Sequence, residues 1–123
     1  MAGLIGLALA GCSTVGAPQA GDLLGENEIV DLMRNPRRWD DRVVTVRIFP
    51  FDNGFRGSYV VCFEACDAAY AARSPFLIYA RQDRFSGYRG DRAEIVTARY
   101  SSGCFYRSGL CPDQRFGLFT EID

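Results

Sequence analysis

The sequence contains no histidine and no lysine, since all 14 of its basic residues are arginine. Without histidine, the chain has no imidazole general base, no Ser-His or Cys-His nucleophile pair and no imidazole metal ligand. Without lysine, it has no Schiff-base amine and no phosphate-loop lysine. The 14 basic and 15 acidic residues nearly cancel, so no overall field draws the chain to nucleic acid or to an anionic membrane.

Catalytic motifs are also missing from the sequence. It has no Gly-x-Ser-x-Gly motif, no Gly-rich phosphate loop and no cluster of carboxylates with metal-ligand spacing. The adjacent carboxylates Asp40 and Asp41 would face opposite sides of a strand and could not share a proton. We therefore expect no metal and no other cofactor, and a binding function rather than an enzymatic one.

Charged residues are absent from the N-terminal segment, where the first charge is Asp22. The apolar run at residues 2–10 is shorter than the roughly 20 residues that a membrane-spanning helix needs, and its length is typical of a signal peptide. The run leads into Leu9-Ala10-Gly11-Cys12. This quartet resembles the lipobox of bacterial lipoproteins. The resemblance implies that residues 1–11 are a cleaved signal peptide and that Cys12 receives lipid, palmitate included.

The resemblance also implies a location. Several acyl chains on one residue anchor a soluble domain stably, whereas a single chain binds a membrane only marginally. In bacterial lipoproteins, a serine rather than an aspartate after the lipidated cysteine implies delivery to the outer membrane, and Ser13 holds that position. We therefore expect a lipid-anchored envelope protein that faces the periplasm. Its expected partner is an envelope protein or polymer, and nucleic acid is not an expected partner of an exported chain.

A second interpretation of the N-terminal segment is an apolar helix packed on the folded domain, with Cys12 as an ordinary thiol. It arises because no Arg or Lys precedes the apolar run, whereas signal peptides usually begin with positive charge. Gly3, Gly6 and Gly11 count against such a helix, since each glycine costs about 1 kcal/mol relative to alanine. Residues 12–25, which are rich in small and turn-forming residues, predict a flexible tether.

The folded domain is expected at residues 26–123, where the hydrophobic pattern becomes regular. Apolar residues at i, i+3 and i+4 over residues 29–33 predict a short helix that Asn35-Pro36 ends. Alternating side chains and turn signals then predict five strands. These strands are expected at residues 43–49, 58–64, 76–81, 92–100 and 115–122, with a short helix or loop at 65–74. Five such strands fit a five-stranded antiparallel OB-like barrel, mostly β, because closure removes exposed edges.

The start of this domain resembles OB-type domains of the tRNA-anticodon-binding-like superfamily. In that family, a helix precedes an aromatic-x-Gly-Lys-x-Val-x-Val strand, which resembles residues 39–46, Trp-Asp-Asp-Arg-Val-Val-Thr-Val. A later Gly-Asp opens the family's fourth strand, as Gly90-Asp91 does here. The resemblance covers most of residues 26–122 and implies an OB barrel. Asp41-Arg42 replaces the usual Gly-Lys, and the family's nucleic-acid binding is not carried over from so general a match.

Lipidation of Cys12 would leave four of the five cysteines, an even number. In a small exported domain, four cysteines predict two disulfides. We favour the local pairs Cys62–Cys66 and Cys104–Cys111, because the end of strand two and the loop between strands four and five lie at opposite poles of an OB-type barrel. The alternatives are a redox-active Cys62–Cys66 pair in a thiol-disulfide redox factor, and a zinc site built from all four cysteines.

The segment 81–92 interleaves four arginines with Phe85 and Tyr88. Guanidinium groups beside aromatic rings would suit a phosphate or an anionic polymer. The other interpretation is a solvated hairpin in which Asp83 and Asp91 neutralise half of the charge and the aromatic rings cap the core. The candidate anion-binding residues are Arg81, Arg84, Arg89 and Arg92.

Overall fold

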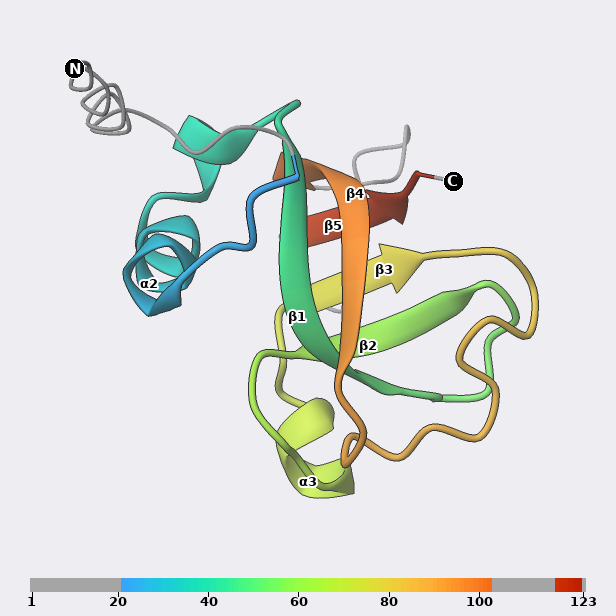
Figure 1. Cartoon of the computed structure of the whole chain (residues 1–123). Helices are drawn as coiled ribbons and strands as arrows, with labels where there is room; N and C mark the ends of the chain where they lie inside the picture. The colour runs from blue at the N-terminus through green and yellow to red at the C-terminus, as the bar shows by residue number, and fades with distance from the viewer. Residues whose placement is uncertain (1–20, 103–116, 123) are drawn as a thin grey trace, which may run out of the picture.

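The computed structural model describes residues 21–102 and 117–122. In chain order the elements are helix α2 (Glu26–Arg34), the 3-10 helix η1 (Pro36–Trp39), strands β1 (Val43–Phe51) and β2 (Ser58–Cys62), helix α3 (Ala68–Ala71), and strands β3 (Phe76–Tyr79), β4 (Glu94–Ser102) and β5 (Gly117–Glu121). The strands of the described chain close into a barrel in the order β1-β2-β3-β5-β4 (Figure 1). The prediction of a five-stranded OB-like barrel preceded by a short helix is confirmed.

The barrel is mixed rather than wholly antiparallel. Strands β3 and β5 run parallel, with Phe76 opposite Gly117 and Tyr79 opposite Thr120, while the other pairs of neighbouring strands are antiparallel. The prediction of an antiparallel barrel is therefore wrong at this one pair. The reason is geometric: strand direction cannot alternate all the way around a closed ring with an odd number of strands. At least one pair must be parallel.

Strand β1 shows how the sequence builds the barrel. Val44, Val46 and Ile48 are buried, whereas Arg47 between them is exposed. Because successive side chains of a strand point to opposite faces, this alternation places one apolar row inside the barrel. The strand runs past residue 49, where the sequence predicted a turn, because Pro50 and Phe51 pair with Val61 and Val60 of β2.

The first contacts with the barrel come before residue 26. Leu23 forms a parallel bridge with Thr45, and the Leu24 N–H donates a hydrogen bond of 2.9 Å to the Thr45 oxygen. The Leu24 side chain is 6% exposed and belongs to the core. The predicted tether at 12–25 therefore includes two residues that pack on the barrel. The predicted signal peptide at 1–11 and Cys12 lie outside the described residues.

Helix α2 packs on the barrel through the predicted apolar stripe. Leu32 is fully buried in the core and Ile29 is partly buried against it. At the end of the helix, Asp31 accepts hydrogen bonds from the Trp39 Nε1 and the Asn35 Nδ2, each at 2.8 Å. These bonds, first among them that of Trp39, lower the pKa of Asp31 and join α2 to η1. Within the described residues, no helix is long and apolar enough to cross a membrane.

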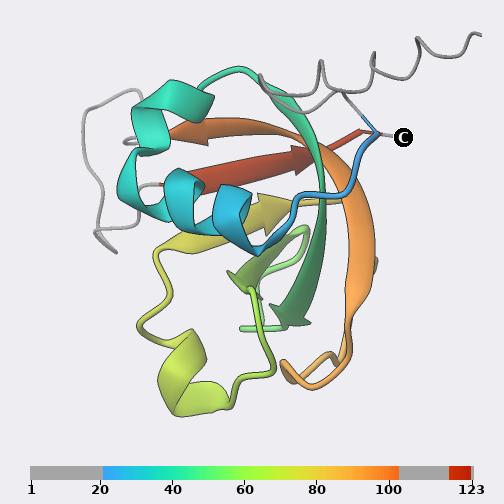
Figure 2. The ribbon, with the colours of Figure 1, turned by 60° about the vertical axis from the view of Figure 1, so that its left-hand side comes forward.

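The connection between β2 and β3 forms α3, in the segment predicted to be a short helix or a loop. Asp67 caps this helix, since its Oδ1 accepts a hydrogen bond of 2.9 Å from the Tyr70 N–H. Ala71 of α3 packs on Val60 and Cys62 in a second small core, outside the barrel. Strand β2 is therefore buried on both faces. Helices α2 and α3 lie on the same side of the barrel (Figures 1 and 2).

Candidate functional site

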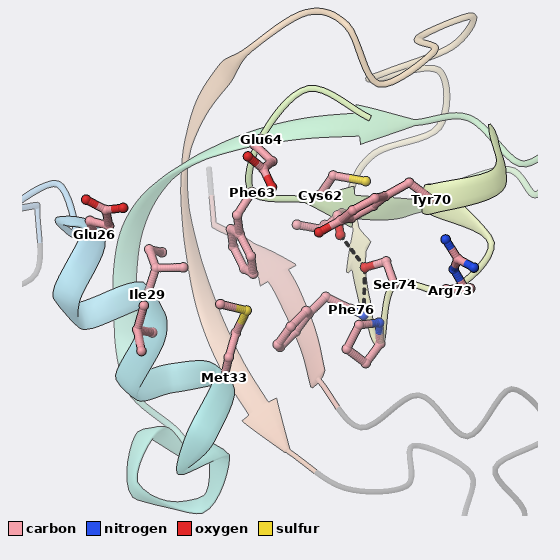
Figure 3. Close-up of a pocket in the computed structure, with 13 residues that line it drawn as sticks. Glu26, Ile29, Met33, Cys62, Phe63, Glu64, Tyr70, Arg73, Ser74 and Phe76 are labelled. Carbon is pink, nitrogen blue, oxygen red and sulfur yellow. Dashed lines mark hydrogen bonds between the residues drawn. The ribbon is translucent and has the colours of Figure 1, made fainter. Parts of the chain in front are cut away.

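A pocket of 420 Å³ lies between α2 and the connection from β2 to β3. Figure 3 shows α2 on one side of this pocket and the segment around α3 on the other, with Phe63 and Phe76 between them. The lining residues are Glu26, Ile29, Val30 and Met33 of α2, residues 61–64, Tyr70, and residues 73–76.

The floor of the pocket is apolar and belongs to the rigid part of the molecule. Val61, Cys62 and Phe76 are buried. The ring of Phe63 meets the ring of Phe76 edge-to-face, with 5.1 Å between centroids, and the ring of Phe119 at 6.1 Å. Because packed aromatic rings hold one another in fixed orientations, the floor keeps its shape when the pocket is empty.

Ser74 lines the pocket just before the start of β3 and links the backbones of β2 and β3. Its side chain is buried, its Oγ donates a hydrogen bond of 2.5 Å to the Val61 oxygen, and it accepts one of 3.3 Å from the Phe76 N–H. The hydroxyl is therefore engaged with the backbone of both strands. This contact gives Ser74 a structural role in the pocket rather than that of a nucleophile.

The rim of the pocket exposes apolar side chains. Val30, Met33 and Tyr70 are 36%, 43% and 48% exposed. Apolar side chains gathered around a concave site mark a surface suited to binding. The thioether of a methionine such as Met33 is flexible and polarizable.

The rim also carries three charged residues, Glu26, Glu64 and Arg73, whose side chains are exposed. Within residues 21–102 and 117–122, the ion pairs are Arg38–Asp31 and Arg84–Glu121. The three rim charges therefore have no ion-pair partner in this part of the chain. Their charge is available to a bound molecule.

A disulfide joins Cys62 to Cys66, with 6.4 Å between the Cα atoms. The predicted local pair is thus present in the structure. Cys62 lines the pocket, so the bond ties the start of the β2–β3 connection to the pocket floor. Because both sulfur atoms are bonded to each other, the four-cysteine zinc site is not formed. The predicted partners Cys104 and Cys111 lie outside the described residues.

The predicted anion-binding segment lies on the connection between β3 and β4, and its arginines have different surroundings. The Nε and Nη2 of Arg84 donate to the Glu121 carboxylate at 3.2 Å, and the guanidinium lies 4.4 Å above the ring of Phe85. Phe85 itself is buried in the barrel core. Arg84 is therefore already paired, and the interpretation in which Phe85 caps the core is confirmed.

The other three arginines of this segment are exposed. The guanidinium of Arg92 lies 4.2 Å above the ring of Tyr88, whose hydroxyl donates a hydrogen bond to Glu94. That hydrogen bond is the main reason why the pKa of Tyr88 is raised. The structure shows no contact that would bring Arg81 and Arg89 together with Arg92. Anion binding by these residues stays a prediction.

The sequence analysis did not predict this pocket, although one of its residues gave a signal for it. Met33, the last residue of the predicted apolar stripe of α2, stands at the rim and is 43% exposed. Val30, which lies outside the i, i+3, i+4 stripe, was the signal that α2 carries more apolar surface than the barrel covers. Glu64 and Arg73 lie in a segment whose path the periodicity did not determine.

The described residues show no arrangement for metal chemistry. No group of three or more His, Cys, Asp or Glu side chains among them is placed to hold a metal ion. The geometry therefore offers a binding pocket with an apolar floor and a charged rim. No protein-family model matches the chain, and no curated protein and no solved structure is significantly similar to it.

Proposed function

We propose that this protein is a lipid-anchored lipoprotein of the cell envelope whose OB-like barrel serves as a non-catalytic binding module. The observation that carries the proposal is the quartet Leu9-Ala10-Gly11-Cys12 after a short apolar run. Lipid on Cys12 anchors the chain, and Ser13 directs it to the outer membrane, facing the periplasm. The stretch 13–22 then leads to Leu23, which forms a bridge with Thr45 of β1. Fully extended, it would reach about 35 Å from the membrane.

Two features of the barrel support this proposal. The Cys62–Cys66 disulfide suits an oxidising compartment such as the periplasm, because the cytosol keeps thiols reduced. The pocket beside α2 supplies a place to bind, with a packed apolar floor and rim charges that have no ion-pair partner among the described residues. The sequence has no histidine that would activate a nucleophile there.

The test is lipid labelling in a Gram-negative host. The wild-type chain should incorporate radiolabelled palmitate, lose residues 1–11 and fractionate with the outer membrane. Cys12→Ser should abolish the label and give an unprocessed precursor or a soluble protein. Ser13→Asp is the matched control: it should keep the label but move the protein to the inner membrane. An unlabelled wild-type chain whose intact mass includes Met1 would contradict the proposal.

The alternative is a thiol-disulfide redox factor, and the position of the disulfide at the pocket favours it. Cys66 is half-buried, so a small thiol has a route to its sulfur, whereas Cys62 is buried. A redox factor should exchange rapidly with glutathione and expose a low-pKa thiol after reduction. Titration of the reduced protein with iodoacetamide between pH 5 and pH 9 separates the two functions. A structural disulfide resists reduction and gives no thiol that reacts at low pH.

A further inference from the structure

We propose that the pocket between α2 and α3 binds a short peptide segment that presents a large apolar side chain next to basic residues. The inference deepens the proposed binding function and rests on it. It names the chemistry of the partner: an envelope protein with an exposed, apolar and basic stretch of chain.

The floor selects an apolar side chain. Phe63 and Phe76 form a rigid aromatic surface, and their rings are braced by the barrel core behind them. A volume of 420 Å³ holds one large apolar side chain together with the backbone that carries it. Each apolar side chain buried there releases water from both surfaces, which is the main source of binding free energy.

The rim favours a partner that lies across the pocket rather than inside it. Met33 on α2 and Tyr70 on α3 stand on opposite sides, and both are substantially exposed (Figure 3). Side chains in these positions cover the flanks of an extended chain whose central residue enters the pocket. The Tyr70 hydroxyl and the Arg73 guanidinium are suited to hydrogen bonds with peptide carbonyls.

The charges at the rim indicate which charge the partner carries. Glu26 and Glu64 carry two negative charges and Arg73 one positive charge, and none of them has an ion-pair partner in the described part of the chain. Figure 3 shows both carboxylates on the side away from Arg73. A basic residue beside the apolar anchor meets these carboxylates, whereas an anionic headgroup on an acyl chain would be repelled by them. The pocket therefore favours a cationic peptide over an anionic lipid.

The experiment uses the full chain with Cys12→Ser, which keeps every other residue. Its probes are unlabelled acetyl-Lys-Leu-Phe-Lys-amide, the acidic analogue with Glu for Lys, the polar analogue with Ser-Ser for Leu-Phe, and sodium laurate. Only the first peptide should bind saturably, and its binding should shift the Met33 methyl signal in NMR spectra. Binding should weaken as salt is raised.

Variants of the protein test the contribution of the rim carboxylates and that of the apolar contacts separately. Glu26→Gln and Glu64→Gln should each weaken binding of the basic peptide by about threefold, the effect of one exposed charge pair. Met33→Ser should weaken it by roughly tenfold, through lost apolar contact. Asp91→Asn, which removes an exposed carboxylate outside the pocket, should leave the affinity unchanged. Thermal unfolding of each variant shows that the barrel is intact.

Three outcomes would overturn the inference: tighter binding of the acidic peptide, binding of laurate in preference to the basic peptide, or no saturable binding of any probe. These results leave the lipid anchor unaffected, because palmitate labelling of Cys12 reports on it separately. Peptide binding by the Cys12→Ser chain, together with a wild-type chain that takes up no palmitate in its host, would overturn the anchor and leave the binding inference intact.

Discussion

The backbone N–H of Cys66 donates a hydrogen bond of 2.8 Å to the carbonyl oxygen of Gly90. Gly90 has a φ of +84°, and a Cβ atom at this position would overlap the carbonyl oxygen and the Sγ of Cys66. The N–H of Gly90 in turn donates a hydrogen bond to the Pro50 oxygen at 2.9 Å. Gly90 therefore joins the disulfide loop, the end of β1 and the β3–β4 connection, and only glycine fits there.

Replacement of this glycine gives the first prediction. Gly90→Ala should lower the free energy of unfolding by about 3 kcal/mol, because it combines an unfavourable φ with steric overlap. Gly87→Ala is the matched control, since Gly87 has a similar φ of +79° but open space around its Cα. The control should lose only about 1 kcal/mol, the cost of the backbone conformation. Urea unfolding measures the free energy of unfolding of both variants. Equal losses in the two variants would show that overlap with Cys66 does not contribute to the effect of Gly90→Ala.

Removal of the disulfide should weaken the barrel without unfolding it. The Cys62→Ala/Cys66→Ala double variant should lose about 2 kcal/mol, the entropy of closing so short a loop in the unfolded chain. The main core is separate from the small core that contains Cys62, so a cooperative transition should remain. Urea unfolding under oxidising conditions measures the loss. A variant without any cooperative transition would contradict the separation of the two cores.

The ion pair between Arg84 and Glu121 should contribute more than the pair between Arg38 and Asp31. The side chains of the first pair are 21% and 12% exposed, whereas those of the second are 69% and 32% exposed. Double-mutant cycles with alanine should give a coupling free energy of about 2 kcal/mol for Arg84–Glu121. The exposed pair should give less than about 1 kcal/mol. The reverse order would mean that desolvation cancels the attraction at Arg84.

Acid should destabilise the loop between β1 and β2 through Asp52. Its carboxylate accepts hydrogen bonds from the Gly87 N–H at 2.8 Å and the Gly54 N–H at 2.9 Å. These bonds, that of Gly87 foremost, hold the pKa of Asp52 below its ordinary value of 3.8. A depressed pKa in the folded state contributes stability above pH 3.8, and this contribution is lost as the pH falls through the folded-state pKa.

The pH dependence of unfolding tests this assignment. Below pH 3.8, the wild-type protein should lose stability more steeply than Asp52→Asn, which has no carboxylate to protonate. Asp91→Asn is the control, because the Asp91 carboxylate forms no hydrogen bond within the described ranges. Urea unfolding at a series of pH values gives the slopes. An unchanged slope in Asp52→Asn would contradict the role of these two hydrogen bonds.

The start of the folded domain can be located by truncation. Deletion of residues 1–20 should leave the free energy of unfolding unchanged, because Leu23 and Leu24, which contact β1 in the described part of the chain, are kept. Leu24→Ala should cost about 2 to 3 kcal/mol, because Leu24 is buried in the core. Leu23→Ala should cost less than about 1 kcal/mol, because Leu23 is 45% exposed. A large loss on deletion of 1–20 would instead support an N-terminal helix packed on the barrel.

The sequence predicted the features that follow from a regular period. Alternation along β1 and the apolar stripe of α2 are properties of neighbouring residues, so the barrel and its helix were visible. The parallel pairing of β3 with β5 depends on how distant strands close a ring, which no local pattern encodes. The burial of Leu24 was not predicted, because a single buried leucine after a polar stretch forms no repeating hydrophobic pattern.

The candidate site was harder to predict from the sequence, because it too depends on contacts between residues that are distant in the chain. Cys62 and Cys66 were paired correctly because the expected OB-type path separates the end of strand two from the loop that carries the other two cysteines. The pocket combines α2 with residues 61–64, Tyr70 and residues 73–76, which lie far from α2 in the chain, and no local pattern indicates that Met33 and Tyr70 face one another. The pairing of Arg84 with Glu121 was missed too, since it joins the β3–β4 connection to the end of β5.

The position of α3 has a consequence for the size of ligand that this barrel accepts. OB folds commonly bind oligonucleotides and oligosaccharides across the outer face of their second and third strands. In this protein, Val60 and Cys62 on that face are buried beneath α3, and the disulfide holds the α3 segment in place. Within the described residues, a long polymer therefore has no open path across this face of β2. The proposed pocket beside α2 would instead offer contacts a few residues long, in which affinity depends on a single anchor rather than on many repeated units.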